Sequence, residues 1–280
     1  MLPQKTFKDI TMNTTTRKVA FFDIDGTLTS EVDNSIPELT IKGIRQAREA
    51  GHLMFINTGR CYHNVPERFR SIGFDGYVCG CGTNIYCDNK EILSAQQTHE
   101  TAMEILQAAR ETDVELLFEA KTHLCFDLTR PLRDLHAIHM YQAFKRKGFD
   151  MPTDLENPNF ICDKFVIWFK EPAQLEAFRK VSDLKFDCID RGGNFREFVP
   201  LGYSKATGIQ TVLDYYNLPL SNAYAFGDSN NDLAMLKYVP NSVAMGNASP
   251  KTLFDEVSYV TDNASQNGIW NALQHLGFFN

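Results

Sequence analysis

Residues 19–27 read Val-Ala-Phe-Phe-Asp-Ile-Asp-Gly-Thr, and they carry the strongest indication of the fold class. A short apolar run, Val19 to Phe22, leads directly into Asp23 and Asp25, which are separated by one residue. The pattern is typical of a buried strand of a parallel sheet that ends in a loop. Because side chains alternate along a strand, we expect the two aspartates on one side of it. Ligands of open α/β sheets bind at this carboxyl edge, so the stretch predicts a site as well as a fold.

Alternating strand and helix patterns surround this stretch on both sides. Residues 18–80 are expected to form a strand, a helix, a strand, a helix and a strand, with apolar strands at 53–56 and 77–79. The carboxyl-terminal part repeats the alternation, with helices or strands at 205–216, 223–226, 233–236, 242–245, 259–261 and 266–276. This order predicts an α/β core with a mainly parallel sheet.

The middle of the chain has a different pattern. Strands at 85–87 and 91–94 flank Asp88-Asn89-Lys90, which indicates a hairpin, and helices are expected at 100–112, 131–147 and 172–181. Leu132, Leu135, Ile138, Tyr141 and Phe144 are expected in the core of this region. We therefore expect an α+β cap domain at 84–194, inserted into a core made of residues 18–83 and 195–280, after an amino-terminal extension of residues 1–17.

Composition limits the classes of function. The 280 residues are 43% hydrophobic and 22% charged, which is ordinary globular usage, and the formal net charge is −7. We expect no nucleic-acid partner, because a basic footprint is missing, and no membrane partner, because no apolar run is long enough to span a bilayer. Met1 and Met12 are alternative starts, and the residues before Lys18 lack the apolar segment of a secretory signal. A cytoplasmic location with reduced thiols is expected, and no oligomeric state is predicted.

Polar residues follow several of the predicted strands at the edge where Asp23 and Asp25 lie. Thr58 follows the strand at 53–56, Asp228 follows the strand at 223–226, and Lys205 opens a helix. Together these residues supply carboxylates, a hydroxyl and an ammonium. Oxygen ligands suit Mg²⁺, and phosphoryl transfer requires little beyond positioning and charge neutralisation.

Asp23-Ile24-Asp25-Gly26-Thr27, Thr58, Lys205 and residues 227–232, Gly-Asp-Ser-Asn-Asn-Asp, resemble the four motifs of the haloacid dehalogenase (HAD) superfamily. Their order and spacing are similar to the Cof-type branch, in which an α/β cap of type C2B lies between the second and third motifs. The resemblance covers nearly the whole chain from Lys18 onward and implies a Rossmann-like core. The loop at 78–83 and Ala206 depart from the pattern of many relatives.

The resemblance also implies roles for the matching residues. Asp23 would attack phosphorus and form an aspartyl-phosphate, and Asp25 would act as the general acid and base. Lys205 would offset negative charge between the nucleophile and the phosphate. The residues implied in phosphate binding are Thr58, Gly59, Arg60, Lys205 and Asn231. The residues implied at the Mg²⁺ site are Asp23, Asp25 through its backbone carbonyl, Asp228 and, in support, Asp232.

The function that this resemblance implies is a Mg²⁺-dependent phosphatase acting on a small phosphorylated metabolite. Sugar phosphates are the first class expected, and phosphorylated cofactors such as pyridoxal phosphate or flavin precursors are the second. Two alternatives remain: a phosphomutase that passes the phosphoryl group to a sugar hydroxyl, and a non-catalytic regulator that binds phosphometabolites. The intact Asp23, Asp25, Lys205 and Asp228 argue against the regulator.

Two further features have both a structural and a functional interpretation. Cys79, Cys81 and Cys87 are close in sequence, and buried thiols are favoured over zinc ligands because a four-ligand set at standard spacing is missing. Residues 121–147 hold six Lys or Arg and two Asp or Glu. A solvated helix face is favoured there over a patch that attracts the phosphorylated substrate through Arg130, Arg133, His136 or His139.

Overall fold

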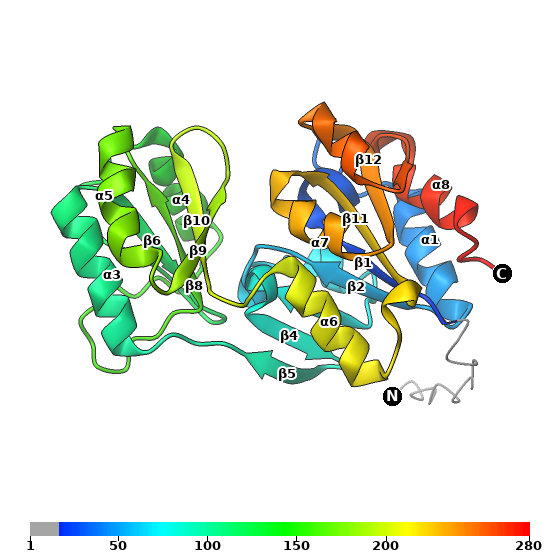
Figure 1. Cartoon of the computed structure of the whole chain (residues 1–280), viewed down its shortest axis with the longest axis horizontal. Helices are drawn as coiled ribbons and strands as arrows, with labels where there is room; N and C mark the ends of the chain where they lie inside the picture. Colours follow the sequence, from blue (N-terminus) through cyan, green and yellow to red (C-terminus); the bar gives the residue numbers. More distant parts are fainter. Residues whose placement is uncertain (1–16) are drawn as a thin grey trace.

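The computed structural model describes residues 17–280, which form two lobes, each with its own sheet (Figure 1). The larger lobe, the core, contains an eight-stranded sheet in the order β13-β12-β11-β1-β2-β3-β4-β5. Strands β13 to β3 in this order are parallel, whereas β4 and β5 are antiparallel. The core strands are β1 (Val19–Phe22), β2 (Leu53–Asn57), β3 (Gly76–Cys79), β4 (Asn84–Cys87), β5 (Lys90–Ser94), β11 (Ala223–Ser229), β12 (Asn241–Ser249) and β13 (Tyr259–Val260).

Helices cover both faces of the core sheet. They are α1 (Glu38–Glu49), α2 (Glu67–Arg70), α6 (Lys205–Tyr216), α7 (Leu233–Tyr238) and α8 (Gly268–His275). Ala20 and Phe22 of β1 pack with side chains of α1, α2 and α8, while Val19 and Phe21 pack on the other face with α6 and α7. Because β1 is buried on both faces, its sequence is a continuous apolar run instead of an alternating one.

The smaller lobe, the cap, is an antiparallel sheet of five strands in the order β7-β6-β8-β10-β9. Helices α3 (His99–Thr112) and α5 (Pro172–Ser182) pack on one face, and α4 (Leu135–Arg146) packs on the other. The cap strands are β6 (Glu115–Glu119), β7 (Leu124–Phe126), β8 (Lys164–Trp168), β9 (Phe186–Asp190) and β10 (Phe195–Pro200). The α/β core and the separate α+β cap confirm the predicted fold class.

The limits expected for the cap, residues 84–194, do not coincide with sheet membership. The predicted hairpin, β4 and β5, forms, but β4 pairs with β3 and so extends the core sheet. At the other limit, β10 lies between β8 and β9 in the cap sheet, where the ring of Phe198 stacks on Phe165 with centroids 4.9 Å apart. The expected extension, residues 1–17, lies outside the described residues except for Arg17.

Two of the residues expected in the cap core, Leu135 and Ile138, are not among the side chains that pack there. Leu135 is 71% exposed because it is the first residue of α4, directly after the capping Asp134, and faces solvent. Phe144, nearer the carboxyl end of α4, is buried as expected.

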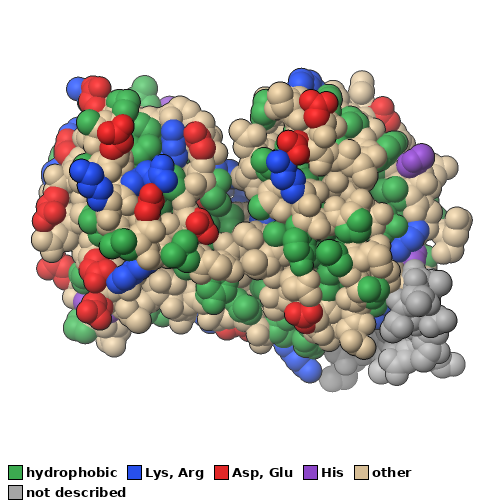
Figure 2. Space-filling view, viewed as in Figure 1, with side chains coloured by type: hydrophobic (Ala, Val, Ile, Leu, Met, Phe, Trp, Pro, Cys, Tyr) green, Lys and Arg blue, Asp and Glu red, His purple; other side chains and the backbone are tan. Residues whose placement is uncertain are grey.

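Figure 2 shows a notch between the two lobes, and acidic and basic side chains are mixed on the face in view. Within residues 17–280 no helix has the length and apolar character needed to cross a membrane.

Candidate active site

The residues predicted at the sheet edge lie together at the carboxyl ends of three neighbouring strands. β1 pairs in parallel with both β2 and β11, so the segments that follow these strands begin side by side. Asp23 follows β1 and donates its backbone N–H to Phe226 O at 3.0 Å, Thr58 follows β2, and Asp228 lies near the end of β11. Lys205 is the first residue of α6 and is 2% exposed.

Lys205 lies between two buried carboxylates. Its Nζ atom is 2.5 Å from Asp23 Oδ1 and 2.6 Å from Asp232 Oδ1. Burial alone would lower the pKa of Lys205, but the charges of Asp23 and Asp232 raise that pKa above its ordinary value. Burial raises the pKa of Asp23 to about 6, although Lys205 opposes this change. Ser204 caps α6 by accepting a hydrogen bond from Thr207 N, which fixes the helix end that carries Lys205.

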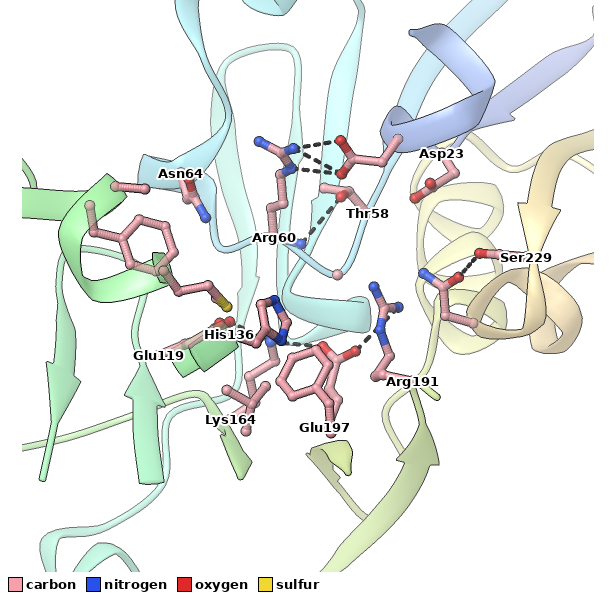
Figure 3. Close-up of a pocket in the computed structure, with 18 of the residues that line it drawn as sticks. Asp23, Thr58, Arg60, Asn64, Glu119, His136, Lys164, Arg191, Glu197 and Ser229 are labelled. Atoms are coloured by element: carbon pink, nitrogen blue, oxygen red, sulfur yellow. Dashed lines mark hydrogen bonds and ion pairs between the residues drawn. The ribbon is translucent and has the colours of Figure 1, made fainter. Parts of the chain in front are cut away.

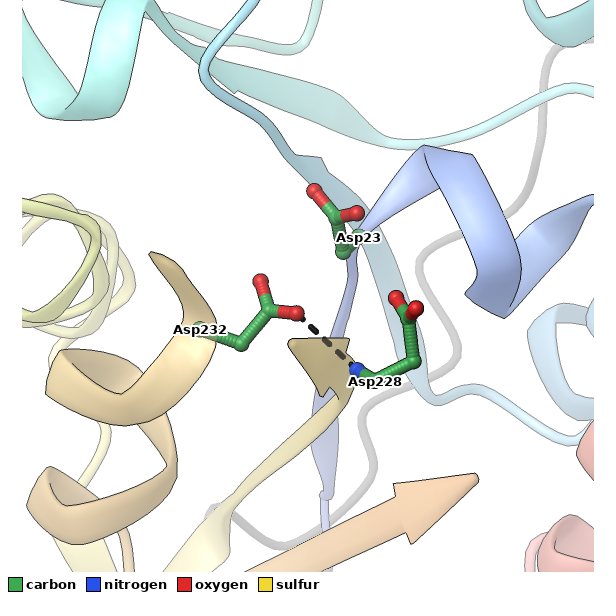
Figure 4. Close-up of side chains that lie close together, drawn as sticks. All are labelled: Asp23, Asp228 and Asp232. Carbon is green, nitrogen blue, oxygen red and sulfur yellow. Dashed lines mark hydrogen bonds between the residues drawn. The ribbon is translucent and has the colours of Figure 1, made fainter. Parts of the chain in front are cut away.

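Three carboxylates converge beside this ammonium. Asp23, Asp228 and Asp232 each offer one oxygen, and these oxygens lie within 4.8 Å of one another (Figure 4). Burial and the neighbouring charges of Asp232 and Asp23 raise the pKa of Asp228 to about 8. Asp232 Oδ2 accepts the backbone N–H groups of Asp228 at 2.9 Å and of Ser229 at 3.1 Å. The oxygen-only donor set fits a hard divalent cation, which would relieve the repulsion between the carboxylates.

Gly26 lets the first motif approach this group closely. Its φ angle is +80°, and a Cβ atom at this position would lie 2.3 Å from Asp228 Oδ2. Any side chain here would therefore displace the carboxylate. Thr27 next to it donates its hydroxyl to Asp228 Oδ1 at 3.2 Å.

The Asp25 side chain lies apart from the three converging carboxylates. Its carboxylate is 62% exposed and forms a bidentate ion pair with Arg60, whose Nη2 atom is 2.7 Å from Oδ1 and 2.8 Å from Oδ2. Arg60 N in turn donates to Thr58 Oγ1 at 3.2 Å. Asp25, Thr58 and Arg60 thus form one connected group at the mouth of the site.

A cavity of about 550 Å³ lies between core and cap over these residues (Figure 3). The core residues that line it include Asp23, Asp25, Thr58, Gly59, Arg60 and Asn231. Asn231 also accepts a hydrogen bond from the hydroxyl of Ser229. Lys205 and Asp228 lie just behind the cavity wall, where both are close to Asp23. Strand β9 of the cap contacts the turn at Asn230–Asp232.

Sequence reasoning did not find the part of the cavity wall that comes from the cap. This part includes the charged residues Glu119, Lys164, Arg191 and Glu197 and the aromatic Phe195. In the sequence, these residues could have been recognised as charged residues directly before apolar strand segments. Lys164 precedes Phe-Val-Ile-Trp, and Glu197 precedes Phe-Val. Such residues are rarely buried without a partner or a role.

The basic segment at 121–147 contributes less to the cavity than its charge suggests. Arg130 and Arg133 both pair with Asp113, Arg133 at 2.9 Å, and neither lines the cavity. His136 and Lys147 line it, whereas His139 does not. Lys121, Arg130 and Arg133 therefore form ion pairs with carboxylates, whereas Lys147 faces the cavity, and the favoured interpretation stays a prediction.

The cysteines follow the favoured interpretation. Cys79, Cys81 and Cys87 are buried free thiols. In residues 17–280 the one group of converging metal ligands contains only aspartates.

The chain is similar to known proteins over most of its length. Residues 20–273 match the family model of the haloacid dehalogenase-like hydrolases. The HMP-PP phosphatase of Serratia proteamaculans is 28% identical, over 92% of this chain and 94% of that protein. The 5-amino-6-(5-phospho-D-ribitylamino)uracil phosphatase YitU of Bacillus subtilis is 27% identical, over 80% of this chain and 85% of that protein.

A solved structure shows the same fold. The structure of BT1666 from Bacteroides thetaiotaomicron superposes with a TM-score of 0.81 at 23% identity, covering 99% of this chain and 98% of that one. The family match spans both lobes, and the cap is the inserted antiparallel sheet described above. The chain therefore belongs to the haloacid dehalogenase superfamily, as a phosphatase of its Cof-type branch, subclass IIB.

Proposed function

We propose that this enzyme hydrolyses the phosphate monoester of a small metabolite through a phosphoryl group carried on Asp23. The observation that supports this most is the position of the Asp23 carboxylate. It lines the cavity, its Oδ1 atom is 2.5 Å from the Lys205 ammonium, and it adjoins a cluster of carboxylates suited to a cation. A carboxylate held in this way is a nucleophile whose charge is offset where the phosphate must approach.

The proposed reaction has two steps. In the first, a carboxylate oxygen of Asp23 forms a bond to phosphorus, the ester P–O bond breaks, and Asp25 gives its proton to the leaving oxygen. In the second, Asp25 takes a proton from water, the water oxygen bonds to phosphorus, and the bond to Asp23 breaks. Inorganic phosphate leaves and both aspartates return to their starting states. Asp25 suits this task because its exposed carboxylate lines the cavity mouth.

Other core residues are proposed to bind the phosphate. Thr58, Gly59, Arg60 and Asn231 line the same end of the cavity as Asp23 and offer hydroxyl, amide and guanidinium donors. Lys205, whose ammonium contacts Asp23, is proposed to neutralise charge as phosphorus is attacked.

Mg²⁺ is the proposed cofactor. Asp23, Asp228 and the backbone carbonyl of Asp25 are the proposed ligands, and Asp232 is proposed to orient Asp228 and Lys205 through the contacts described above. When bound, the ion would neutralise negative charge on the phosphate.

The proposed substrates are sugar phosphates or phosphorylated cofactor precursors. The two relatives carry the names of phosphatases that act on small phosphorylated metabolites. A cavity of about 550 Å³ that is enclosed between core and cap suits a ligand of this size and limits access of bulk water.

The direct test uses p-nitrophenyl phosphate. We expect hydrolysis that requires Mg²⁺ and stops on chelation, and we expect Asp23→Asn to abolish it. Asp255→Asn, a change of the same kind at an exposed surface aspartate, should leave the rate unchanged. Full activity of Asp23→Asn would refute the assigned nucleophile. Interconversion of sugar phosphate isomers with stimulation by a sugar bisphosphate would instead identify a phosphomutase, and tight phosphate-ester binding without turnover would identify a regulator.

A further inference from the structure

Three charged side chains of the cap meet at the floor of the cavity, and we name them the cap triad: Glu119, Lys164 and Glu197. They come from the adjacent strands β6, β8 and β10. Lys164 Nζ forms an ion pair with Glu119 Oε2 and lies 2.7 Å from Glu197 Oε1. The three side chains are at most 9% exposed, and all three line the cavity that Asp23 lines (Figure 3).

Stability does not explain why these charges are buried here. Removing charges from water is costly, and well-packed apolar residues of similar volume are often equally or more stable than a buried ion pair. The cap triad carries two negative charges and one positive charge, and Arg191, 3.6 Å from Glu197 Oε2, supplies a second positive charge. These two negative and two positive charges line a cavity. Their burial there is explained if their remaining polar atoms bind a ligand.

Two thiols from the core orient the carboxylates of the cap triad. Cys61 Sγ donates to Glu119 Oε2 at 3.7 Å, and Cys81 Sγ donates to Glu197 Oε1 at 3.4 Å. These are the same two oxygens that Lys164 contacts. One oxygen of each glutamate is therefore contacted by both lobes, and the other oxygen of Glu197 lies 3.6 Å from Arg191.

The cap triad consequently has unused hydrogen-bonding capacity. Within residues 17–280, no hydrogen bond reaches Glu119 Oε1, and Glu197 Oε2 lies 3.6 Å from Arg191 Nη1. Lys164 has three N–H donors and forms ion pairs with only two carboxylates of the described chain. The floor thus offers acceptors on both sides of a donor.

We propose that the cap triad binds the leaving group of the substrate, recognising a neutral hydrogen-bond donor that lies beside an acceptor. The donor would bind Glu119 Oε1, and the acceptor would accept a hydrogen bond from Lys164 Nζ. Adjacent hydroxyls of a polyol have this chemistry, and so does an amino group beside a ring nitrogen. The apolar wall at Phe195 and Val166 would pack against the carbon skeleton of either group. This inference rests on the proposed phosphatase function and adds the residues that select the substrate.

The first experiment compares matched substrates of the unaltered enzyme with Mg²⁺ present. One pair is a hexitol 6-phosphate and n-hexyl phosphate, and the other is an aminopyrimidinylmethyl phosphate and benzyl phosphate. In at least one pair we expect kcat/KM to be at least about tenfold higher for the polar member, because its analogue leaves hydrogen-bonding groups of the cap triad without a partner. The pair that shows this preference tells whether the enzyme recognises the adjacent hydroxyls of a polyol or an amino group beside a ring nitrogen.

The second experiment changes Glu119 to Gln, which keeps the shape but replaces a charged acceptor. For the preferred substrate, kcat/KM should fall about 10- to 100-fold further than for acetyl phosphate, whose leaving group is only acetate. Glu104→Gln, at an exposed cap residue paired with Lys185, should change neither value. A thermal melt checks that Glu119→Gln folds. If the variant does not fold, the comparison of the two substrate pairs still tests the role of the cap triad.

Failure of this inference is distinct from failure of the proposed function. Turnover of acetyl phosphate without a preference in either pair would overturn the role of the cap triad alone. An equal loss on both substrates in folded Glu119→Gln would also overturn that role. No turnover of any phosphate ester or of acetyl phosphate would overturn the proposed function and this inference together.

Discussion

Arg60 holds Asp25 in a bidentate ion pair across the mouth of the active site, with its Nη2 atom 2.7 Å and 2.8 Å from the two carboxylate oxygens. Its Nε atom is 3.1 Å from Oδ2. Arg60 follows β2 and Asp25 follows β1, so the pair also joins the segments after two neighbouring strands. The pair presents Asp25 as a carboxylate, the form that takes a proton from water in the second proposed step, and the arginine fixes its position.

Arg60→Lys should impair turnover by loosening Asp25. Lysine keeps the positive charge but cannot form the planar two-point contact of a guanidinium. We expect kcat for an alkyl phosphate to fall about tenfold, which corresponds to about 1.4 kcal/mol. The loss on p-nitrophenyl phosphate should be smaller, because nitrophenolate leaves without help from an acid.

The matched control for Arg60→Lys is Arg179→Lys. Arg179 forms a similar pair with Asp183 on the exposed surface of α5, with Nε 2.9 Å from Oδ2. We expect unchanged kcat in this variant. Equal losses on the alkyl and nitrophenyl substrates in Arg60→Lys would show that Arg60 does not act through Asp25 as the acid.

Lys205→Met should destabilise the fold as well as stop turnover. The substitution leaves Asp23 and Asp232 buried near each other without the ammonium that contacts both. Breaking a buried ion pair by removing one partner costs about 3–5 kcal/mol. Urea unfolding measures the loss, and adding Asp232→Asn to Lys205→Met should restore part of it. Simple additivity of the two changes would contradict the coupling.

Mg²⁺ alone should raise the melting temperature if it binds the three converging carboxylates. A ligand at about 100 times its Kd stabilises the native state by about 2.7 kcal/mol. Asp228→Asn should remove this shift, because it replaces one of the three negatively charged carboxylates by a neutral amide. Asp262→Asn, at an exposed aspartate that accepts a hydrogen bond from Asn271, should retain it. An undiminished shift in Asp228→Asn would place the cation elsewhere.

Asp163 should make stability fall as pH rises. The side chain is buried, and burial raises its pKa to about 7, although Lys121 and Lys164 oppose this change. The folded protein therefore binds this proton more tightly than the unfolded chain, whose carboxyl titrates near pH 4. The contribution of Asp163 to the free energy of unfolding should therefore decrease between about pH 4 and pH 7 and stay constant above that range.

Asp163→Asn removes this dependence. We expect the variant to be more stable than the unaltered protein at pH 8, by at most about 4 kcal/mol, and to differ little near pH 4. Denaturant unfolding across this range measures the difference, and Asp187→Asn at an exposed position of β9 provides the control. A constant difference at all pH values would mean that Asp163 does not titrate in this window.

Regular local patterns explain why much of the core was predictable. The helix expected at 205–216 has those limits in the structure, because Ser204 caps it and the left-handed Asn217 ends it. The hairpin of β4 and β5 was also expected, but its membership of the core sheet depends on pairing with β3. Strand β10 was missed because Arg196 and Glu197 interrupt its apolar residues.

Local patterns in the sequence identified the α/β core, the inserted cap and the polar residues that follow the strands. They could do so because apolar periodicity identifies the elements, and parallel strands bring the residues after them to one edge. The folded arrangement pairs Arg60 with Asp25 and brings Glu119, Lys164 and Glu197 together on the cavity floor. These contacts join segments far apart in the chain, and they depend on sheet register and on how the cap lies against the core, which no local pattern specifies.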